Sequence, residues 1–378
     1  MKLPMNRRQW LKVSAVAAAS LAVRRDVSGA EWIAPPSPER DQPFIRLHSN
    51  ENPYGPSRRA RCAMITAFDE GCRYPSGHYE ELKRLIAEKE GVSPDHVILG
   101  AGSHEILRMA GVAYGLEGGE VLTAYPTYEG LEHYARTIGA YVHRVPLTAD
   151  FQIDLDAMDR RITQAVRLVF VCNPNNPTGR ILPGDQLREF CRAISRRTVV
   201  LVDEAYHDYV QAREYASMID LVREGYNVIV SRTFSKIHAL AGLRVGYGLA
   251  RPDIIARLGQ FRTNHSVNIL GLRAAIASYQ DASFQDFSRR KNAEARTYLY
   301  RVLGELGRRY IPSQTNFVFF HLGREVTAFR QAMKEHGVLV GRPFPPYTNW
   351  CRLSLGTMEE MELFAQAFRK VMGRGAAG

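Results

Sequence analysis

The chain has 378 residues, of which 45% are hydrophobic and 24% are charged. This length can bury a large core and predicts two domains. Residues 1–30 hold six Lys/Arg and one Asp, and removing their +5 from the total of +11 leaves about +6 for the rest. We therefore expect no nucleic-acid binding, since no basic stripe interleaved with aromatic residues occurs. The five cysteines show no metal-ligand spacing and no even disulfide framework, so the sequence predicts no metal site.

The amino terminus carries a pattern typical of targeting segments. Arg7 and Arg8 precede a run of small apolar residues at 13–23, and residues 28–30 (Ser-Gly-Ala) offer a small-x-small cleavage site. This resembles a twin-arginine export signal and predicts an exported, periplasmic protein. The run is shorter than the ~20 apolar residues that a bilayer span requires, so we expect no stable membrane insertion of the mature chain. An amphipathic arm and the amino end of a membrane anchor are the alternatives.

Beyond the amino terminus, short apolar runs alternate with helical patterns. A helix is predicted at 80–90, where Leu82, Leu85 and Ile86 share one face. This alternation predicts a mostly parallel α/β sheet. From about residue 275 the pattern changes to a long charged helix at 284–306, a strand at 317–320 and a last helix that begins at the capping box of Thr357 and Glu360, which indicates a smaller α+β domain. The predicted strands of the larger sheet are residues 97–100, 120–124, 168–172, 199–203, 228–231 and 245–249.

The segment Ser-Arg-Thr-Phe-Ser-Lys at 231–236 is the most informative of the chain, and Arg244 follows eight residues later. A lysine amine forms an imine with an aldehyde, while hydroxyl groups and a guanidinium bind a phosphate dianion. A cofactor that carries both an aldehyde and a phosphate fits this set, which indicates pyridoxal phosphate. A solvated surface lysine is the alternative for Lys236 taken alone.

Two polar clusters directly follow apolar runs, and both are expected at the carboxyl ends of strands, where open parallel sheets bind ligands. Residues 173–179 read Asn-Pro-Asn-Asn-Pro-Thr-Gly, and Asp203 ends the run at 199–203. A buried Asp203 would keep a pyridine nitrogen protonated, and Asn176 and Tyr206 can hydrogen-bond the phenolic oxygen of the ring. The alternative interpretations are a turn-rich loop for the first cluster and a helix cap for Asp203.

These segments together resemble the fold-type I aminotransferases, and specifically their histidinol-phosphate aminotransferase-like branch. The resemblance extends from about residue 46 to the last helix. It also rests on Ser-Asn-Glu-Asn-Pro-Tyr-Gly-Pro at 49–56, Arg-Tyr-Pro at 73–75, Gly-Ala-Gly-Ser-His-Glu at 100–105, Tyr-Pro-Thr-Tyr at 125–128 and Cys-Arg-Leu-Ser-Leu-Gly-Thr at 351–357.

The resemblance implies a ping-pong transamination between an amino acid and a 2-oxo acid on pyridoxal 5'-phosphate. Lys236, Asp203 and Tyr206 would be the catalytic residues, with Lys236 as the Schiff-base lysine and proton shuttle and its pKa lowered by cationic and apolar neighbours. Arg352 would hold the substrate α-carboxylate. The implied cofactor-binding residues are Ser103 and His104 at a helix start, Tyr128 on the ring face, Asn176, Asp203, Tyr206, Thr233, Ser235, Lys236, Arg244 and, from the partner subunit, the residue equivalent to Tyr74.

The resemblance also implies domain boundaries and an assembly. After a signal peptide at 1–30, residues 31–60 would form an arm that contributes to the small domain, 61–274 the large cofactor-binding domain and 275–378 the small domain. Because Tyr74 would reach the cofactor phosphate of the neighbouring subunit, a homodimer with two shared sites is expected.

The substrate is open at this point. In the resembled branch an arginine of a Gly-Val-x-Val-Arg strand and the tyrosine of Asn-Pro-Tyr bind a substrate phosphate, which makes Arg342, Tyr54 and Asn176 substrate-binding candidates beside Arg352. Here Gly341 occupies the expected place and Arg342 comes one residue later, and a shift by one residue on a strand points a side chain to the opposite face. A phosphorylated and a nonphosphorylated amino donor are both compatible with this sequence. A decarboxylase, lyase or racemase on the same fold is the alternative enzyme class, and a noncatalytic ligand-binding protein is the third.

Overall fold

The computed structural model describes residues 44–373. The predicted export signal at 1–30, residues 31–43 of the predicted arm and residues 374–378 of the predicted small domain lie outside the described residues. Within the described part of the chain, no helix has both the length and the apolar character that crossing a membrane requires.

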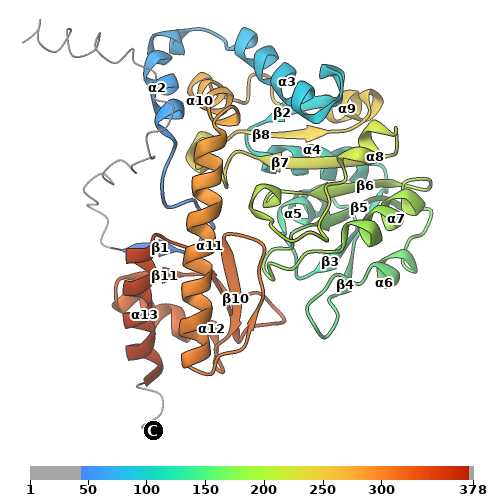
Figure 1. The fold of residues 1–378 in the computed structure, drawn as a ribbon. Coiled ribbons are helices and arrows are strands. Elements are labelled where there is room, and N and C mark those ends of the chain that lie inside the picture. The colour runs from blue at the N-terminus through green and yellow to red at the C-terminus, as the bar shows by residue number, and fades with distance from the viewer. Residues whose placement is uncertain (1–43, 374–378) are drawn as a thin grey trace, which may run out of the picture. The chain divides into compact units, whose positions relative to one another are not determined.

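A seven-stranded sheet is formed by strands that lie between residues 97 and 249 (Figure 1). All neighbouring strands are parallel except at β8 (Gly246–Leu249), which is antiparallel to both β2 (Val97–Gly100) and β7 (Val228–Thr233). The prediction of a mostly parallel α/β sheet is therefore confirmed. In spatial order the strands are β2 (Val97–Gly100), β8 (Gly246–Leu249), β7 (Val228–Thr233), β6 (Val199–Asp203), β5 (Val166–Cys172), β3 (Glu120–Tyr125) and β4 (Val142–Pro146).

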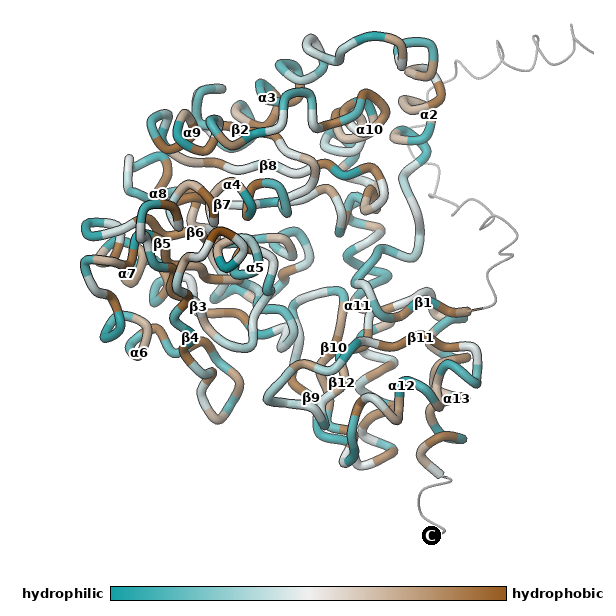
Figure 2. Tube along the Cα trace, turned by 180° about the vertical axis from the view of Figure 1, so that it is seen from behind, coloured by the Kyte–Doolittle hydropathy of each residue, from teal (hydrophilic) through white to brown (hydrophobic). Residues whose placement is uncertain are grey.

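Helices cover both faces of this sheet. Along β5, Val169 and Val171 pack into one hydrophobic cluster, while Leu168 and Phe170 pack into another on the opposite face. Strands buried on both faces read as continuous apolar runs, which is why the sequence predicted them. Figure 2 shows these apolar strands inside more polar outer turns. One cluster includes α2 (Arg58–Thr66), α3 (Ser76–Glu90), α6 (Leu155–Asp159), α7 (Gly184–Ile194), α8 (Ile219–Arg223) and α10 (Ile269–Tyr279); the other includes α4 (Ser103–Gly115), α5 (Gly130–Thr137) and α9 (Pro252–Gly259).

The carboxyl-terminal third forms a smaller α+β arrangement with its own hydrophobic cluster. The long helix α11 (Ala282–Glu305) leads from the large sheet to this part (Figure 1). The capping box predicted before the last helix is present, because Thr357 Oγ1 accepts from the Glu360 N–H at 3.2 Å and Glu360 Oε2 accepts from the Thr357 N–H at 2.8 Å. The remaining elements are the antiparallel strands β12 (Trp350–Ser354), β10 (Phe317–His321) and β9 (Tyr310–Ile311), the parallel pair β1 (Ile45–Leu47) and β11 (Val338–Val340), and the helices α12 (Val326–Glu335) and α13 (Met358–Gly373).

Candidate active site

A cavity of about 530 Å³ lies where strands β5, β6 and β7 of the large sheet end. Asp203 is the last residue of β6 and Thr233 the last of β7, so the parallel register brings both to the same edge. All the predicted site residues line this cavity except Tyr54 and Tyr74. The lining members of the predicted set are Ser103, His104, Tyr128, Asn176, Asp203, Tyr206, Thr233, Ser235, Lys236, Arg244, Arg342 and Arg352.

Lys236 extends into the cavity and its Nζ donates a 3.0 Å hydrogen bond to the main-chain oxygen of Asn50. Burial, together with the nearby cations Arg352 and Arg244, lowers the pKa of Lys236 from 10.5 to about 8. A substantial fraction of this amine is therefore neutral near pH 8, as a nucleophile and proton carrier requires.

Asp203 is the buried carboxylate of the site, with 2% of its surface exposed. Burial raises its pKa to about 7, with Ser231 acting against this rise and the charge of Glu204 adding to it. Its Oδ1 accepts no hydrogen bond from any residue that the structure describes. A buried acceptor without a partner is costly, so the site fits a cationic N–H donor at this oxygen, such as a protonated pyridine nitrogen.

The phenol of Tyr206 receives hydrogen bonds from two amides. Asn50 Nδ2 donates to Tyr206 Oη at 3.0 Å, and Asn176 Nδ2 donates to it at 3.5 Å. Asn176 Oδ1 in turn accepts from Arg352 Nη1 at 2.8 Å. The cofactor-facing residues and the predicted carboxylate-binding arginine thus belong to one hydrogen-bond network, in which Asn50 is a member that the sequence did not identify.

The start of α4 forms an anion-binding corner with Arg244. The first N–H groups of a helix have no partner within it and lie at the positive end of its dipole, which places Ser103 and His104 well for a phosphate. Arg244 Nη1 donates to Ser235 Oγ at 3.3 Å, and Thr233 Oγ1 donates to the same oxygen at 2.9 Å. Gly102 is required here, since its φ is +78° and an added Cβ would lie 2.3 Å from Arg244 Nη2.

Arg352 projects from β12 into the cavity and is 9% exposed. Its Nη2 donates to the main-chain oxygen of His48 at 2.8 Å, and its Nε has no partner among the described residues. Burial lowers the pKa of Arg352, yet its usual value is so high that it stays charged. A buried cation with an unused donor can bind a carboxylate strongly.

Arg342 also lines the cavity, although alternation along a continuous strand would have pointed its side chain to the opposite face. Strand β11 ends at Val340, so Arg342 no longer follows the strand's alternation. Gly341 lies against β12, with its N–H donating to the Arg352 oxygen at 3.1 Å. A Cβ at this position would approach that oxygen to 2.2 Å, so only glycine fits this close approach to β12.

Tyr54 and Tyr74 lie outside the cavity of their own chain. The Tyr54 ring packs edge-on against Phe287, with 5.0 Å between centroids. Tyr74 is 80% exposed and its ring stacks on His265 at 4.7 Å. Their roles in cofactor and substrate binding stay predictions.

The cavity also has residues that the sequence did not single out. His48 and Asn50 come from the segment before α2, Cys172 ends β5, and Arg330 comes from α12. The segment at 49–56 was noted as a motif, which was the available signal for Asn50. Arg330 had none, because a lone arginine on a polar helix face looks like any solvated residue.

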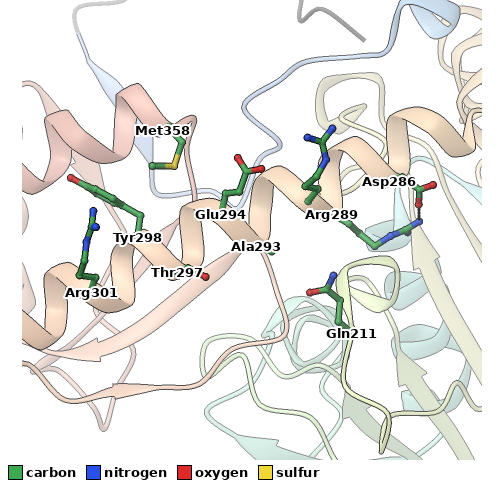
Figure 3. Close-up of a pocket in the computed structure, with 10 residues that line it drawn as sticks. Gln211, Asp286, Arg289, Ala293, Glu294, Thr297, Tyr298, Arg301 and Met358 are labelled. Carbon is green, nitrogen blue, oxygen red and sulfur yellow. Dashed lines mark hydrogen bonds and ion pairs between the residues drawn. The ribbon is translucent and has the colours of Figure 1, made fainter. Parts of the chain in front are cut away.

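A second, larger cavity of about 780 Å³ lies along α11 and is open to solvent (Figure 3). Charged residues of this cavity pair with one another, as in the ion pair of Arg289 with Asp286. None of the predicted site residues lines it. Size alone therefore does not identify the functional site of this protein.

Comparisons with known proteins agree with this geometry. The family model for aminotransferase class I and II matches residues 42–368. The chain is 41% identical to a histidinol-phosphate aminotransferase from Moorella thermoacetica, over 87% of this chain and 85% of the relative. It is 38% identical to histidinol-phosphate aminotransferase 2 from Ralstonia nicotianae, over 88% and 90% respectively.

Among solved structures, a histidinol-phosphate aminotransferase from Sinorhizobium meliloti in complex with pyridoxal-5'-phosphate superimposes with a TM-score of 0.81. The two sequences are 27% identical, and the match covers 88% of this chain and 92% of the other. The chain belongs to the class I and II aminotransferases. It is accordingly an enzyme with the fold-type I architecture that transfers amino groups with pyridoxal phosphate.

Proposed function

We propose that the amino donor is an amino acid with a free α-carboxylate and that the acceptor is a 2-oxo acid. The observation that carries this is Arg352, a buried arginine whose Nε is unused and whose Nη1 is hydrogen-bonded to Asn176. A carboxylate bound by this guanidinium brings the substrate α-carbon into the cavity that also holds Lys236.

Pyridoxal phosphate, when bound, supplies an aldehyde that captures the amine and a ring that withdraws electrons from the substrate carbon. We assign its ring nitrogen to Asp203, its phenolic oxygen to Tyr206 and Asn176, and a ring face to Tyr128. Its phosphate falls to Ser103, His104, Thr233, Ser235 and Arg244. Lys236 would hold the aldehyde, and its free Nζ would carry the proton between substrate and cofactor.

Histidinol phosphate is the second candidate donor, because it is the substrate in the names of the relatives. A half-reaction screen separates the two: the holoprotein is mixed with single amines, and bleaching of the cofactor absorbance is followed. The proposal expects bleaching by amino acids that carry an α-carboxylate. Bleaching by histidinol phosphate alone would favour the second candidate. Loss of carbon dioxide or racemised substrate would instead indicate the decarboxylase or racemase alternative.

We further propose that the active form is a homodimer. Three exposed apolar side chains, Ile65, Phe68 and Tyr74, lie close together in sequence around the end of α2. Clustered apolar exposure of this kind is typical of a surface that another subunit covers.

We also propose that the protein is exported through the twin-arginine pathway. This rests on Arg7, Arg8 and the apolar run that follows them. A fusion of residues 1–35 to a reporter that acts only when exported folded should be translocated. Replacing both arginines with lysine should retain it inside the cell. Equal export of both versions would point to another route.

A further inference from the structure

If the protein is the aminotransferase proposed above, the side chains that its substrate can carry depend on the residues around Arg352. Phe344 connects the two arginines of the cavity. The guanidinium carbon of Arg342 lies 4.3 Å from the centroid of this ring and that of Arg352 lies 4.9 Å from it. A substrate held at Arg352 by its carboxylate therefore extends its side chain into the neighbourhood of Arg342.

Arg342 is already engaged by a carboxylate. Its Nη2 forms an ion pair with Glu129 Oε2, which comes from a segment 213 residues earlier. Glu129 directly follows Tyr128, a residue that lines the cavity. The pair thus joins the segment around Tyr128 to the segment between β11 and β12.

Few other charged residues line the part of the cavity near Arg342. Arg330 lines the cavity, and no carboxylate of residues 44–373 forms an ion pair with it. Burial lowers the pKa of His48, so this ring is neutral at physiological pH. Glu51 is occupied by Arg46 at 2.9 Å. This part of the cavity thus has one cation without an ion-pair partner among the described residues, Arg330, and one that Glu129 already neutralises, Arg342.

We propose that Glu129 is a specificity-determining residue that selects against substrates with a distal phosphate. A phosphate dianion is best bound by two cations, and here Glu129 holds one of them. A phosphorylated substrate must compete with Glu129 for Arg342 and then lies beside a released carboxylate of like charge. A neutral or singly charged side chain meets neither penalty, because Arg330 can bind one carboxylate and Arg342 stays paired.

The pair is about half exposed, with side-chain exposures of 47% for Arg342 and 40% for Glu129. Exposed pairs are weak, so the selection is a matter of degree, and we expect about a fivefold effect from the pair.

The test uses holoprotein in four forms: wild type, Glu129→Gln, Arg342→Gln and the double variant. Calorimetry measures the Kd of two matched ligand pairs, L-serine with O-phospho-L-serine and histidinol with histidinol phosphate. The half-reaction rate is followed in parallel for each amine. Glu88→Gln, an exposed carboxylate on α3 outside the cavity, controls for the loss of one negative charge.

Glu129→Gln should tighten binding of the phosphorylated member of each pair about fivefold or more and leave the unphosphorylated member unchanged. The gain should disappear in the Arg342→Gln background. Equal effects on both members, no effect, or a gain that persists without Arg342 would overturn the proposal. If no amine bleaches the cofactor in any form, the proposed function is wrong, while the calorimetric comparison still decides the role of Glu129.

Discussion

The amine of Lys236 donates a 3.0 Å hydrogen bond to the main-chain oxygen of Asn50, a residue 186 positions earlier. Asn316 Nδ2 donates to the same oxygen at 2.9 Å, and the Asn50 side chain binds Tyr206. Three segments that are remote in sequence therefore meet at the reactive amine. The chemistry of the site therefore depends on the contact between these three segments as well as on the residues at the sheet edge.

Arg352→Ala should mainly raise the amino acid concentration needed for half-maximal rate. Charge-assisted hydrogen bonds contribute about 1.5–3 kcal/mol each, so we expect an increase of roughly a hundredfold in KM and a smaller change in kcat. Steady-state kinetics with an amino acid and with its amino alcohol, which lacks the carboxylate, provide the measurement and its control. An equal loss with both substrates would contradict the assigned role.

The rate at which the apoprotein takes up pyridoxal phosphate should rise with pH through about 8, because only the neutral amine attacks the aldehyde. The pKa of Lys236 is lowered to about 8, so the amine is protonated below that pH and neutral above it. Stopped-flow absorbance after mixing gives the rate. The rate at which Nα-acetyl-lysine reacts with pyridoxal phosphate should instead rise near the ordinary lysine pKa of about 10.4. A protein curve that coincides with that of free lysine would show that the cavity does not shift this pKa.

Arg232→Ala should destabilise the protein strongly. Arg232 is 7% exposed and holds two buried carboxylates, Glu204 at 3.0 Å and Glu90 at 2.6 Å. Removing one partner of a buried ion pair costs about 3–5 kcal/mol, because the remaining charges are left unpaired. The free energy of unfolding in urea measures the loss.

Arg369→Ala is the matched control for that variant. Arg369 pairs with Glu305 at 2.7 Å, but both side chains are nearly half exposed, so its loss should change stability by at most about 1 kcal/mol. Equal urea midpoints for the two variants would show that the buried network carries no special stability.

The strands and the residues at their carboxyl ends could be predicted from the sequence for a physical reason. Strands buried on both faces are continuous apolar runs, and Asp203 and Lys236 stand where such runs end. Strand β4 was missed because it lies at the sheet edge, where only Val142 and Val145 are buried.

The contacts that close the cavity could not be predicted in the same way. Glu129 and Arg342 are ordinary surface-like charges in the sequence, and only the packing of two distant segments makes them partners. Arg342 can face the cavity because the strand ends at Val340, two residues before it, so strand alternation no longer sets the direction of this side chain. The expected role of Tyr74 depends on a second subunit, and a single sequence carries no geometry for that contact.

Hybrid dimers should recover activity from two impaired variants. Tyr74 is 80% exposed on its own chain, consistent with a role at a neighbouring site. Lys236→Ala and Tyr74→Ala subunits, co-expressed with different tags and purified through both, should contain one site with both intact contributions. Tyr74→Phe, which keeps the ring and loses the hydroxyl, separates packing from hydrogen bonding. Inactive hybrids of proven composition, or a fully active monomer by light scattering, would argue against shared sites.

The position of the covalent bond to the cofactor tests the assignment of Lys236. Borohydride reduction of the holoprotein, followed by proteolysis and mass spectrometry, should place the reduced cofactor on the peptide that contains Lys236. The Lys236→Ala variant should carry no covalent cofactor and should transfer no amino groups. Reduced cofactor on another lysine of the wild-type protein, or turnover by the variant, would contradict the assignment of Lys236.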